Sequence, residues 1–391
     1  MRYIMIFFLF FSLPIFAQTG PVNSKGKQFP SEMKTFKSEE SGLAVTQLTT
    51  DPSDDSGLYF TQNGFIPDEH RLIFTSKRTG RWNLFSMNLD DGTFIQLTDG
   101  RSIAGTGAAV SSRTKQIFFI DSSVVKALDL KTLKENDLYK IPAGYSIGSS
   151  LTITSDGKTL AFSINERIVL ATTTSKIYSD MDEKFEKKPW CAVVSGNTDG
   201  TGWHEILREK KWISHTLINP QNGNQILFCH EGNWKQVEQR LWLVASDGTG
   251  NHMVRPEETP EIQIGHEFWF NDGIHIGYQC SIPKDKNKYI GIADAGTGSF
   301  IEYPTTFKDN HVQTNPGGTL FVGDGTDNDP FINLYRLENK KLAGTHIYRH
   351  GGSFSKQEYH PHPVFTPDGN FIFFTSSKDG NGNIYMIKIK E

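Results

Sequence analysis

The chain has 391 residues, a formal net charge of −4, 28 phenylalanines and 36 glycines. A chain of this length can bury one large core or two ordinary ones, and this much Phe and Gly suits an all-β protein with many tight turns. The negative charge argues against the basic surface that a nucleic acid partner requires, and no stretch reaches the roughly 18 apolar residues of a membrane span.

The N-terminus predicts an export signal. A basic residue precedes the apolar run Ile4–Phe16, and Ala17 follows as a small residue for cleavage. This pattern is typical of a secretory signal peptide covering residues 1–17, so we expect an exported, periplasmic protein. Residues 18–41 are polar and rich in Lys and Ser, which predicts a loosely held N-terminal arm.

A strand–turn–strand unit of about 40–50 residues then repeats along the chain. Its plainest copy, Leu58–Gly100, contains strand-like runs joined by Pro-Asp and Asp-Gly turns. Further copies begin near Gly107, Ser150, His215, His266, His311 and His362. Seven units predict one all-β domain over residues 42–391, a single seven-bladed β-propeller. A charged insertion with helical character interrupts the third blade at about residues 172–190.

The two ends of this domain are expected to meet. The last copy, His362–Glu391, stops one strand short, whereas an orphan strand, Val45–Thr49, stands at the front. The orphan resembles the missing piece, which is Ile95–Thr98 in the first copy. We therefore expect Val45–Thr49 to join the C-terminal blade and close the ring without an unpaired edge.

Alignment of the copies by their first turn predicts a site. We take the residue just before each turn and count back four positions. The residues found there in the seven copies are Gln62, Gly107, Ser150, His215, His266, His311 and His362. The first strand of each propeller blade lines the central channel, so these positions should surround one mouth of it. Four of the seven are histidine in a chain with only 12 histidines. They fall in successive blades and predict an arc of imidazoles around half of the mouth.

The stretch Gln357–Pro367 adds ligands to this arc. His360 and His362 are two residues apart, so an extended backbone would turn both imidazoles to one face. With Gln357 just before them, they form a candidate site for a divalent ion such as Mn²⁺, Zn²⁺ or Fe²⁺. The absence of a thiolate or a carboxylate cluster from this stretch argues against a structural zinc and a calcium cage.

Two residues of the fourth blade are predicted to face the same mouth. His230 ends one strand and Arg240 begins the next. Arginine suits a bidentate grip on a carboxylate, and a histidine left off the metal can act as a general base. A metal, a base and an arginine together suit removal of a proton α to a carboxylate, such as the C5 proton of a sugar acid.

These motifs resemble those of the oligogalacturonate lyases, seven-bladed propellers that split short pectin fragments by β-elimination. The resemblance runs from about Trp212 to the C-terminus. It includes F-C-H-E-G at Phe228–Gly232, G-H-E-F-W at Gly265–Trp269 and Q-x-x-H-P-H-P within Gln357–Pro367. The chain departs from the family in the first blade, where Ser53–Phe60 has no counterpart of a Cys-His-Arg-Asn stretch.

The resemblance implies a role for each site residue. It implies one bound divalent ion, typically Mn²⁺, with the ligands His311, Gln357, His360 and His362. It further implies that His266 is the base that removes the C5 proton and that Arg240 grips the substrate. We expect His215 and His230 to bind the oligogalacturonide beside Arg240.

Two other interpretations stay open at this point. The repeats also fit a non-catalytic binding propeller of the TolB-like kind, although such a protein does not need an arc of histidines. A lyase acting on another uronate-containing oligosaccharide would use the same machinery with a different subsite. Metal analysis would distinguish the binding propeller from a metal-dependent lyase, and a substrate panel would distinguish the two kinds of lyase. The sequence leaves the oligomeric state open.

Overall fold

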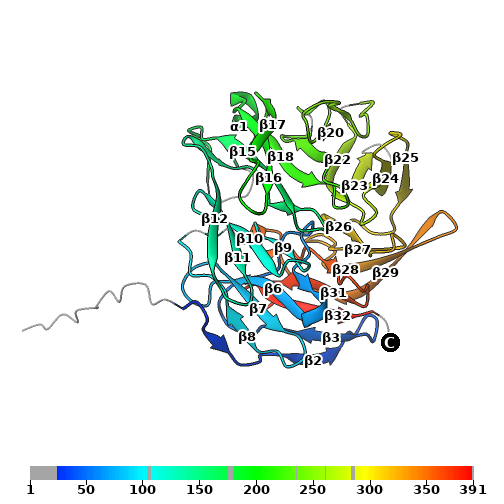
Figure 1. Ribbon diagram of the computed structural model, residues 1–391. Helices are drawn as coiled ribbons and strands as arrows, with labels where there is room; N and C mark the ends of the chain where they lie inside the picture. The colour runs from blue at the N-terminus through cyan, green and yellow to red at the C-terminus, as the bar shows by residue number, and fades with distance from the viewer. Residues whose placement is uncertain are drawn as a thin grey trace, which may run out of the picture.

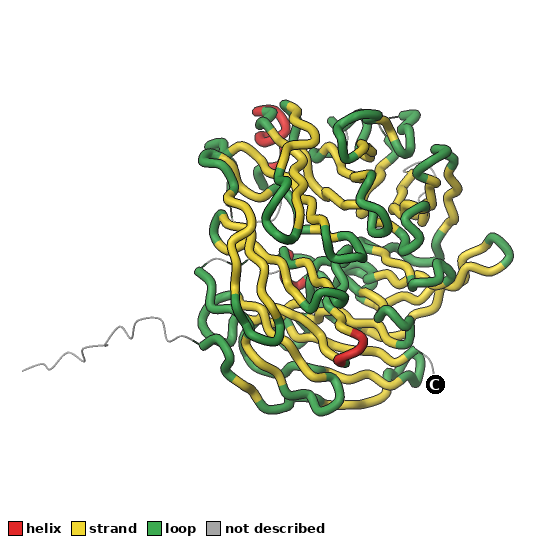
Figure 2. Tube along the Cα trace, in the orientation of Figure 1, coloured by secondary structure: helices red, strands yellow, loops and turns green. Residues whose placement is uncertain are grey.

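The computed structural model describes residues 24–389 except 102, 104–106, 175–178, 235, 260 and 283–286. The predicted signal peptide therefore lies outside the described residues. The described part of the chain forms seven antiparallel sheets that stand as blades around one ring (Figures 1 and 2). The predicted all-β, seven-bladed propeller is confirmed.

The first four blades follow one another along the chain, each starting with its innermost strands. Blade 1 contains β4 (Asp55–Ser56), β5 (Phe65–Ile66), β6 (Arg71–Ser76), β7 (Asn83–Asn88) and β8 (Phe94–Gln96), with β1 (Gln28–Phe29) outside. Blade 2 contains β9 (Ala109–Ser111), β10 (Gln116–Asp121), β11 (Val124–Asp129) and β12 (Glu135–Lys140). Blade 3 contains β13 (Tyr145–Ile147), β14 (Thr152–Ile153), β15 (Thr159–Glu166), β16 (Cys191–Asn197) and β17 (His204–Glu209). Blade 4 contains β18 (Ile213–Ile218), β19 (Gln225–His230), β20 (Leu241–Ala245) and β21 (His252–Met253).

The last three blades complete the ring. Blade 5 contains β22 (Gln263–Trp269), β23 (His275–Ile282), β24 (Asn287–Asp294) and β25 (Phe300–Pro304). Blade 6 contains β26 (Val312–Thr314), β27 (Leu320–Gly323), β28 (Phe331–Glu338) and β29 (Lys341–Arg349). Blade 7 contains β30 (Val364–Phe365), β31 (Phe371–Ser376), β32 (Asn383–Lys388), β3 (Ala44–Gln47) and β2 (Lys34–Lys37). Short helices lie outside the sheets: α1 (Met181–Lys187) in the predicted insertion, and the 3₁₀ turns η1 (Pro67–Glu69) and η2 (Gln357–Tyr359).

The turn between β30 and β31 illustrates why the repeat folds as it does. Gly369 has φ of 69°, a left-handed conformation that glycine adopts without steric cost. A carboxylate oxygen of Asp368 accepts a hydrogen bond from the backbone N–H of Asn370 at 3.0 Å. The Pro-Asp-Gly motif of the sequence thus reverses the chain, and the apolar residues on either side pair as strands.

Strand β3 closes the ring, as the sequence predicts. It pairs with β32 in antiparallel register, with Val45 opposite Ile387. The backbone N–H of Leu48 continues the ladder by donating to Ile384 at 2.8 Å. Val45 and Leu48 are both fully buried. Figure 1 shows the blue strand β3 beside the red strand β32, so the two ends of the domain share one blade.

The described part of the N-terminal arm differs from the expectation. Strand β2 pairs with β3 along its whole length, and β1 pairs with β8 of blade 1. Ser38 adds a hydrogen bond from its hydroxyl to the carbonyl of Ile347 at 2.7 Å. Residues 24–41 are therefore held against blades 6, 7 and 1, because their strands and side chains satisfy polar groups that a free arm would leave to water.

The apolar core lies mainly between neighbouring blades. One cluster joins Val322 and Ile332 of blade 6 to Ile372 and Tyr385 of blade 7. Another joins Leu227 of blade 4 to its neighbours in blade 5. This packing holds the inner strands at fixed positions around the channel, which is what a site built from several blades requires. Among the described residues, no helix is long and apolar enough to cross a membrane.

Candidate active site

A cavity of about 710 Å³ lies beside the innermost strands of blades 4, 5 and 6. It brings together residues that are far apart in the sequence. The predicted site residues on its wall are His215, Arg240, His266, His311, Gln357 and His360.

Three histidines of the predicted arc share an uncommon backbone conformation. His215, His266 and His362 have φ of 47°, 53° and 46°, in the left-handed region. This conformation costs a residue other than glycine on the order of 1–2 kcal/mol. At His215 and His266 the pairing register with the next strand also shifts. Such a bulge re-aims a side chain, and both of these imidazoles lie on the cavity wall rather than following simple strand alternation.

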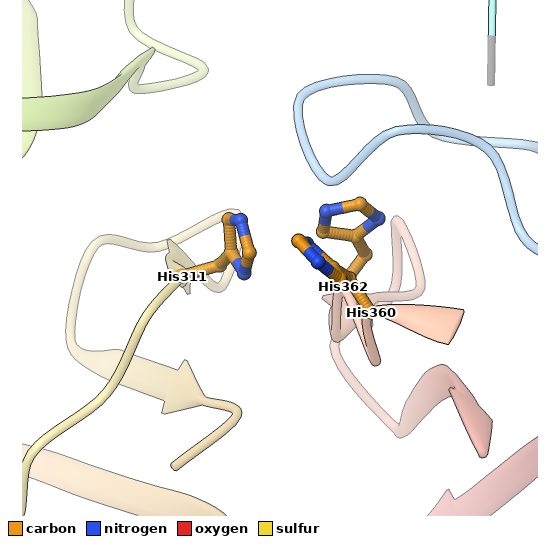
Figure 3. A group of neighbouring side chains, drawn as sticks. All are labelled: His311, His360 and His362. Carbon is orange, nitrogen blue, oxygen red and sulfur yellow. The ribbon is translucent and has the colours of Figure 1, made fainter. Parts of the chain in front are cut away.

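His311, His360 and His362 form the candidate metal centre. One ring nitrogen from each lies within 4.8 Å of the other two, and all three residues are buried. Figure 3 shows the ring of His311 facing His360 and His362 across a small gap. Three of the four predicted ligands therefore converge on one point, from blade 6 and from the loop that enters blade 7.

Hydrogen bonds select which nitrogen of each ring can bind a cation. Nδ1 of His311 lies 2.6 Å from a carboxyl oxygen of Asp324, so Nε2 is the nitrogen left to face a cation. Nε2 of His360 donates to the carbonyl of Phe354 at 3.1 Å, which leaves Nδ1 as the acceptor. Nδ1 of His360 and Nε2 of His362 are buried and have no hydrogen-bond partner among the described residues. Buried lone pairs with no donor fit a metal ligand set with outer-shell support.

The charge state of these rings also suits a metal. Burial lowers the pKa of all three imidazoles, and the positive charge of neighbouring histidines adds to the effect at His311 and His362. They are therefore neutral near pH 7, which is the form that binds a cation.

Gln357 stands beside this centre. It is the first residue of η2, and its carbonyl accepts a hydrogen bond from the N–H of His360. The tight turn puts the two residues on the wall of the same cavity. The side-chain amide oxygen of Gln357 as the fourth ligand stays a prediction from the sequence.

His266 is held as a neutral imidazole. Its Nδ1 lies 2.8 Å from the amide oxygen of Gln279 and donates to it. The amide of Gln279 is fixed in this orientation, because its NH₂ group donates to the carbonyl of Asp309 at 2.9 Å. Nε2 of His266 thus has the lone pair. Burial, followed by the positive charge of His215, lowers the pKa of His266 to about 4, so the ring is neutral near pH 7.

Arg240 is buried and held by a carboxylate. Its two terminal nitrogens lie 2.8 and 3.1 Å from the two oxygens of Glu231. Burial alone would raise the pKa of Glu231, but the charges of Arg240 and His215 and the hydrogen bonds from Arg240 and Ser214 together outweigh it and lower the pKa to about 2. The Trp234 ring lies 4.7 Å from the guanidinium. Nε of Arg240 is buried and has no hydrogen-bond partner among the described residues, so the N–H at the Nε edge of the guanidinium could donate to an anion.

A glycine keeps that edge open. A Cβ atom at Gly265 would lie 2.8 Å from the Trp234 ring and 3.3 Å from Nε of Arg240. Contacts this short force neighbours to move. Glycine in the G-H-E-F-W motif therefore leaves room both for the tryptophan and for a ligand at the arginine.

The two remaining predicted residues have different surroundings. His215 is on the cavity wall, where its Nε2 contacts the Tyr59 hydroxyl at 3.3 Å. His230 differs from the expectation: it lines a neighbouring cavity of about 310 Å³, and its Nε2 is bonded to Glu209 at 2.7 Å. His230 ends β19, where the side chain points to the blade 3 side of the sheet and not to the channel mouth.

Sequence reasoning missed the residues that support the site. Glu231, Asp324, Gln279 and Tyr59 all contact a predicted site residue. Glu231 stands inside the motif F-C-H-E-G, so that motif contained a signal, and Asp324 lies in the sequence V-G-D-G at Val322–Gly325. Nothing in the local sequence marks Gln279 or Tyr59, because their partners come from other strands.

Comparison with known proteins finds relatives along nearly the whole chain. A family sequence model described as oligogalacturonate lyase matches residues 23–391. An oligogalacturonide lyase of Pectobacterium atrosepticum is 28% identical over 94% of this chain and 99% of its own length. A solved structure of an oligogalacturonate lyase in complex with manganese is 29% identical, with a TM-score of 0.87 over 94% of this chain and 99% of that one. An oligogalacturonate lyase structure from Vibrio parahaemolyticus is 26% identical, with a TM-score of 0.86 over the same shares.

Proposed function

The chain belongs to the oligogalacturonate lyase family, and from this premise we propose that it cleaves short oligogalacturonides by metal-dependent β-elimination. The observation that supports the proposal best is the convergence of three neutral imidazoles on one point beside a fourth, His266, whose Nε2 is free to accept a proton. A site for binding alone would not require a buried neutral base next to a cation site.

We propose Mn²⁺ as the cation, held by His311, Gln357, His360 and His362. The donor set supports this choice, since imidazole nitrogens and an amide oxygen suit a borderline divalent ion, and a solved relative is described as a manganese complex. When bound, the cation supplies positive charge to a uronate carboxylate, which makes the neighbouring C5 proton more acidic.

The protein groups perform the remaining steps. The Nε edge of Arg240 holds a substrate carboxylate, while Glu231 keeps the guanidinium in place. Nε2 of His266 takes the C5 proton, and the resulting imidazolium is stabilised by its bond to Gln279. Loss of the C4 oxygen then gives a 4,5-unsaturated uronate.

A substrate panel tests this function. When Mn²⁺-loaded protein is mixed with digalacturonate, the ultraviolet absorbance should rise as a 4,5-unsaturated uronate forms. A chelator should abolish this increase. Activity on a different uronate disaccharide, with none on digalacturonate, would show that the protein is a lyase for another uronate-containing oligosaccharide. Metal binding without elimination on any uronate would refute the lyase function and favour a binding propeller.

We also propose that the protein is exported. The basis is the N-terminal sequence alone, with an apolar run at Ile4–Phe16 and a cleavage position after Ala17. Mass spectrometry of protein from a periplasmic fraction should find a mature N-terminus at Gln18. An uncleaved chain found only in the cytoplasmic fraction would contradict this proposal.

A further inference from the structure

The proposed elimination needs a proton donor as well as a base. When the C4–O4 bond breaks, the glycosidic oxygen leaves as the anomeric hydroxyl of the neighbouring sugar. An unprotonated sugar oxygen is a poor leaving group, so a positioned acid contributes to the rate. His266 cannot take this role at the same time, because it starts neutral and accepts the C5 proton.

A chain of three side chains crosses from blade 1 to blades 4 and 5 at the cavity. The hydroxyl of Tyr59 lies 3.3 Å from Nε2 of His215. On the other side of the same ring, Nδ1 lies 3.3 Å from a carboxylate oxygen of Glu267. Tyr59 and His215 are both on the wall of the cavity that holds His266 and Arg240. A phenol, an imidazole and a carboxylate therefore stand in series at the site.

From this geometry we propose that Tyr59 is the acid that protonates the leaving O4 oxygen, and that His215 and Glu267 position and recharge it. The inference rests on the proposed lyase function and adds a residue to it.

Packing fixes the phenol. The Tyr59 ring lies 4.9 Å from the His362 ring in an edge-on contact and 4.7 Å from the ring of Phe60. The His215 ring stacks on His266 with centroids 6.4 Å apart. These contacts place the proposed acid within the same group of rings as the metal ligand His362 and the base.

The charges around His215 favour its protonated form. Glu267 is fully buried, and neither of its oxygens accepts a hydrogen bond from the described residues, so His215 is the partner for its charge at ion-pair distance. Burial alone would lower the pKa of His215, but the nearby carboxylates of Glu267 and Glu231 together outweigh it and the net shift is upward. A protonated His215 donates from Nε2 to the Tyr59 oxygen.

A second metal is a poor explanation for this cluster, although Cys229 lies within reach of His215 and Glu267. Burial raises the pKa of the Cys229 thiol well above its usual range. A thiol that keeps its proton is a weak ligand.

The proposed step conserves atoms and charge. Nε2 of His266 accepts the C5 proton, and the electron pair of that bond forms the C4–C5 double bond. The C4–O4 bond breaks with its pair on O4, which takes the proton of the Tyr59 hydroxyl. The phenolate takes the proton on Nε2 of His215, and both imidazoles return to their starting states by exchange with water. Nothing is oxidised or reduced.

The variant Tyr59→Phe, assayed on substrates with two different leaving groups, distinguishes an acid role of Tyr59 from a structural one. One substrate is digalacturonate, whose leaving group needs a proton. The other is a galacturonoside carrying a 4-nitrophenyl ether at O4, whose phenolate leaves without one. We expect Tyr59→Phe to lose roughly 10²–10⁴-fold in kcat on digalacturonate and less than about 10-fold on the aryl ether. His266→Ala should lose activity on both.

Two further variants sharpen the test. Glu267→Gln should show the same dependence on leaving group as Tyr59→Phe, with a smaller loss. Lys288 is another ionisable donor on the cavity wall, and Lys288→Gln should lack this dependence. Metal content, measured in every variant, should match the parent protein.

The proposal is wrong if Tyr59→Phe keeps its kcat on digalacturonate, or if its kcat falls by the same factor on both substrates. It is also wrong if the kcat of Lys288→Gln falls on digalacturonate but not on the aryl ether, as expected for Tyr59→Phe. Failure of the parent protein to cleave either substrate would instead refute the proposed function.

Discussion

The pair formed by Glu231 and Arg240 leads to a prediction about stability and substrate binding together. Glu231→Gln keeps the size of the side chain but removes its charge. The Arg240 side chain is 5% exposed and that of Glu231 is 11% exposed. The substitution therefore leaves a buried guanidinium without its main counter-charge.

The expected loss of stability follows from the pKa of Glu231. Its value falls from 4.5 to about 2 on folding, and one unit of pKa difference corresponds to about 1.4 kcal/mol. The carboxylate thus contributes about 3 kcal/mol to the free energy of unfolding at pH 7. Breaking a buried ion pair by removing one partner typically costs about 3–5 kcal/mol, which agrees in magnitude.

The sign of the pH dependence is fixed by the downward shift. A group whose pKa is lower in the folded state stabilises the fold above its unfolded pKa and loses that contribution as the pH falls through its folded pKa. The difference between the parent and Glu231→Gln should be about 3 kcal/mol at pH 7 and about 2 kcal/mol at pH 3.5. It should shrink further towards pH 2.

Urea unfolding followed by tryptophan fluorescence at several pH values measures this difference. Glu205→Gln is a matched control, because Glu205 pairs with Arg208 at the surface, with side chains 38% and 35% exposed. Such a pair contributes at most about 1 kcal/mol. Equal unfolding midpoints for the parent and Glu231→Gln at pH 7, or a difference that does not change with pH, would refute the reasoning. The variant should also raise KM for digalacturonate, since Arg240 loses the partner that positions it.

Three further predictions concern the ring, the metal and the base. Deletion of residues 1–50 removes β3 and should lower the urea midpoint sharply, because the fully buried Val45 is lost and β32 becomes an open edge. A midpoint equal to that of the full chain would contradict ring closure. His360→Ala and His362→Ala should each lose most bound Mn²⁺ by elemental analysis, whereas full occupancy in both would exclude the site. His266→Ala should keep its metal but lose roughly 10²–10⁴-fold in kcat on digalacturonate, and near-parental turnover would show that another group is the base.

Much of the fold could be predicted from the sequence because its determinants are local. Each copy contains its own strands and turn, and Gly369 illustrates how one residue directs one chain reversal. The missing last strand and the orphan Val45–Thr49 could be matched by their residues alone. The short strands β1 and β2 could not, because each depends on a neighbouring edge that exists only after the ring has formed.

The same distinction between local and distant determinants applies to the site. His266, His311 and His362 recur at one position of the repeat, so alignment of the copies found them. Their partners do not recur, and they come from other strands or from other blades. His230 was misplaced because a strand end can face either neighbour, and the sequence does not state which blade supplies Glu209.

The left-handed histidines have a consequence for how new activities could arise on this scaffold. Three blades hold an imidazole by one repeated backbone shape, yet the rings differ in chemistry because the residues behind them differ. An amide lies behind His266, whereas a carboxylate lies behind His215. The role of a position is thus decided by its partner, independently of the scaffold that presents it.

Ser150, the equivalent position of blade 3, already lies on the cavity wall. A histidine introduced there, with a partner chosen from β15, would extend the arc by one blade. Rotational repetition lets such a ring gain or exchange reactive groups one blade at a time, without redesign of the groups already in use.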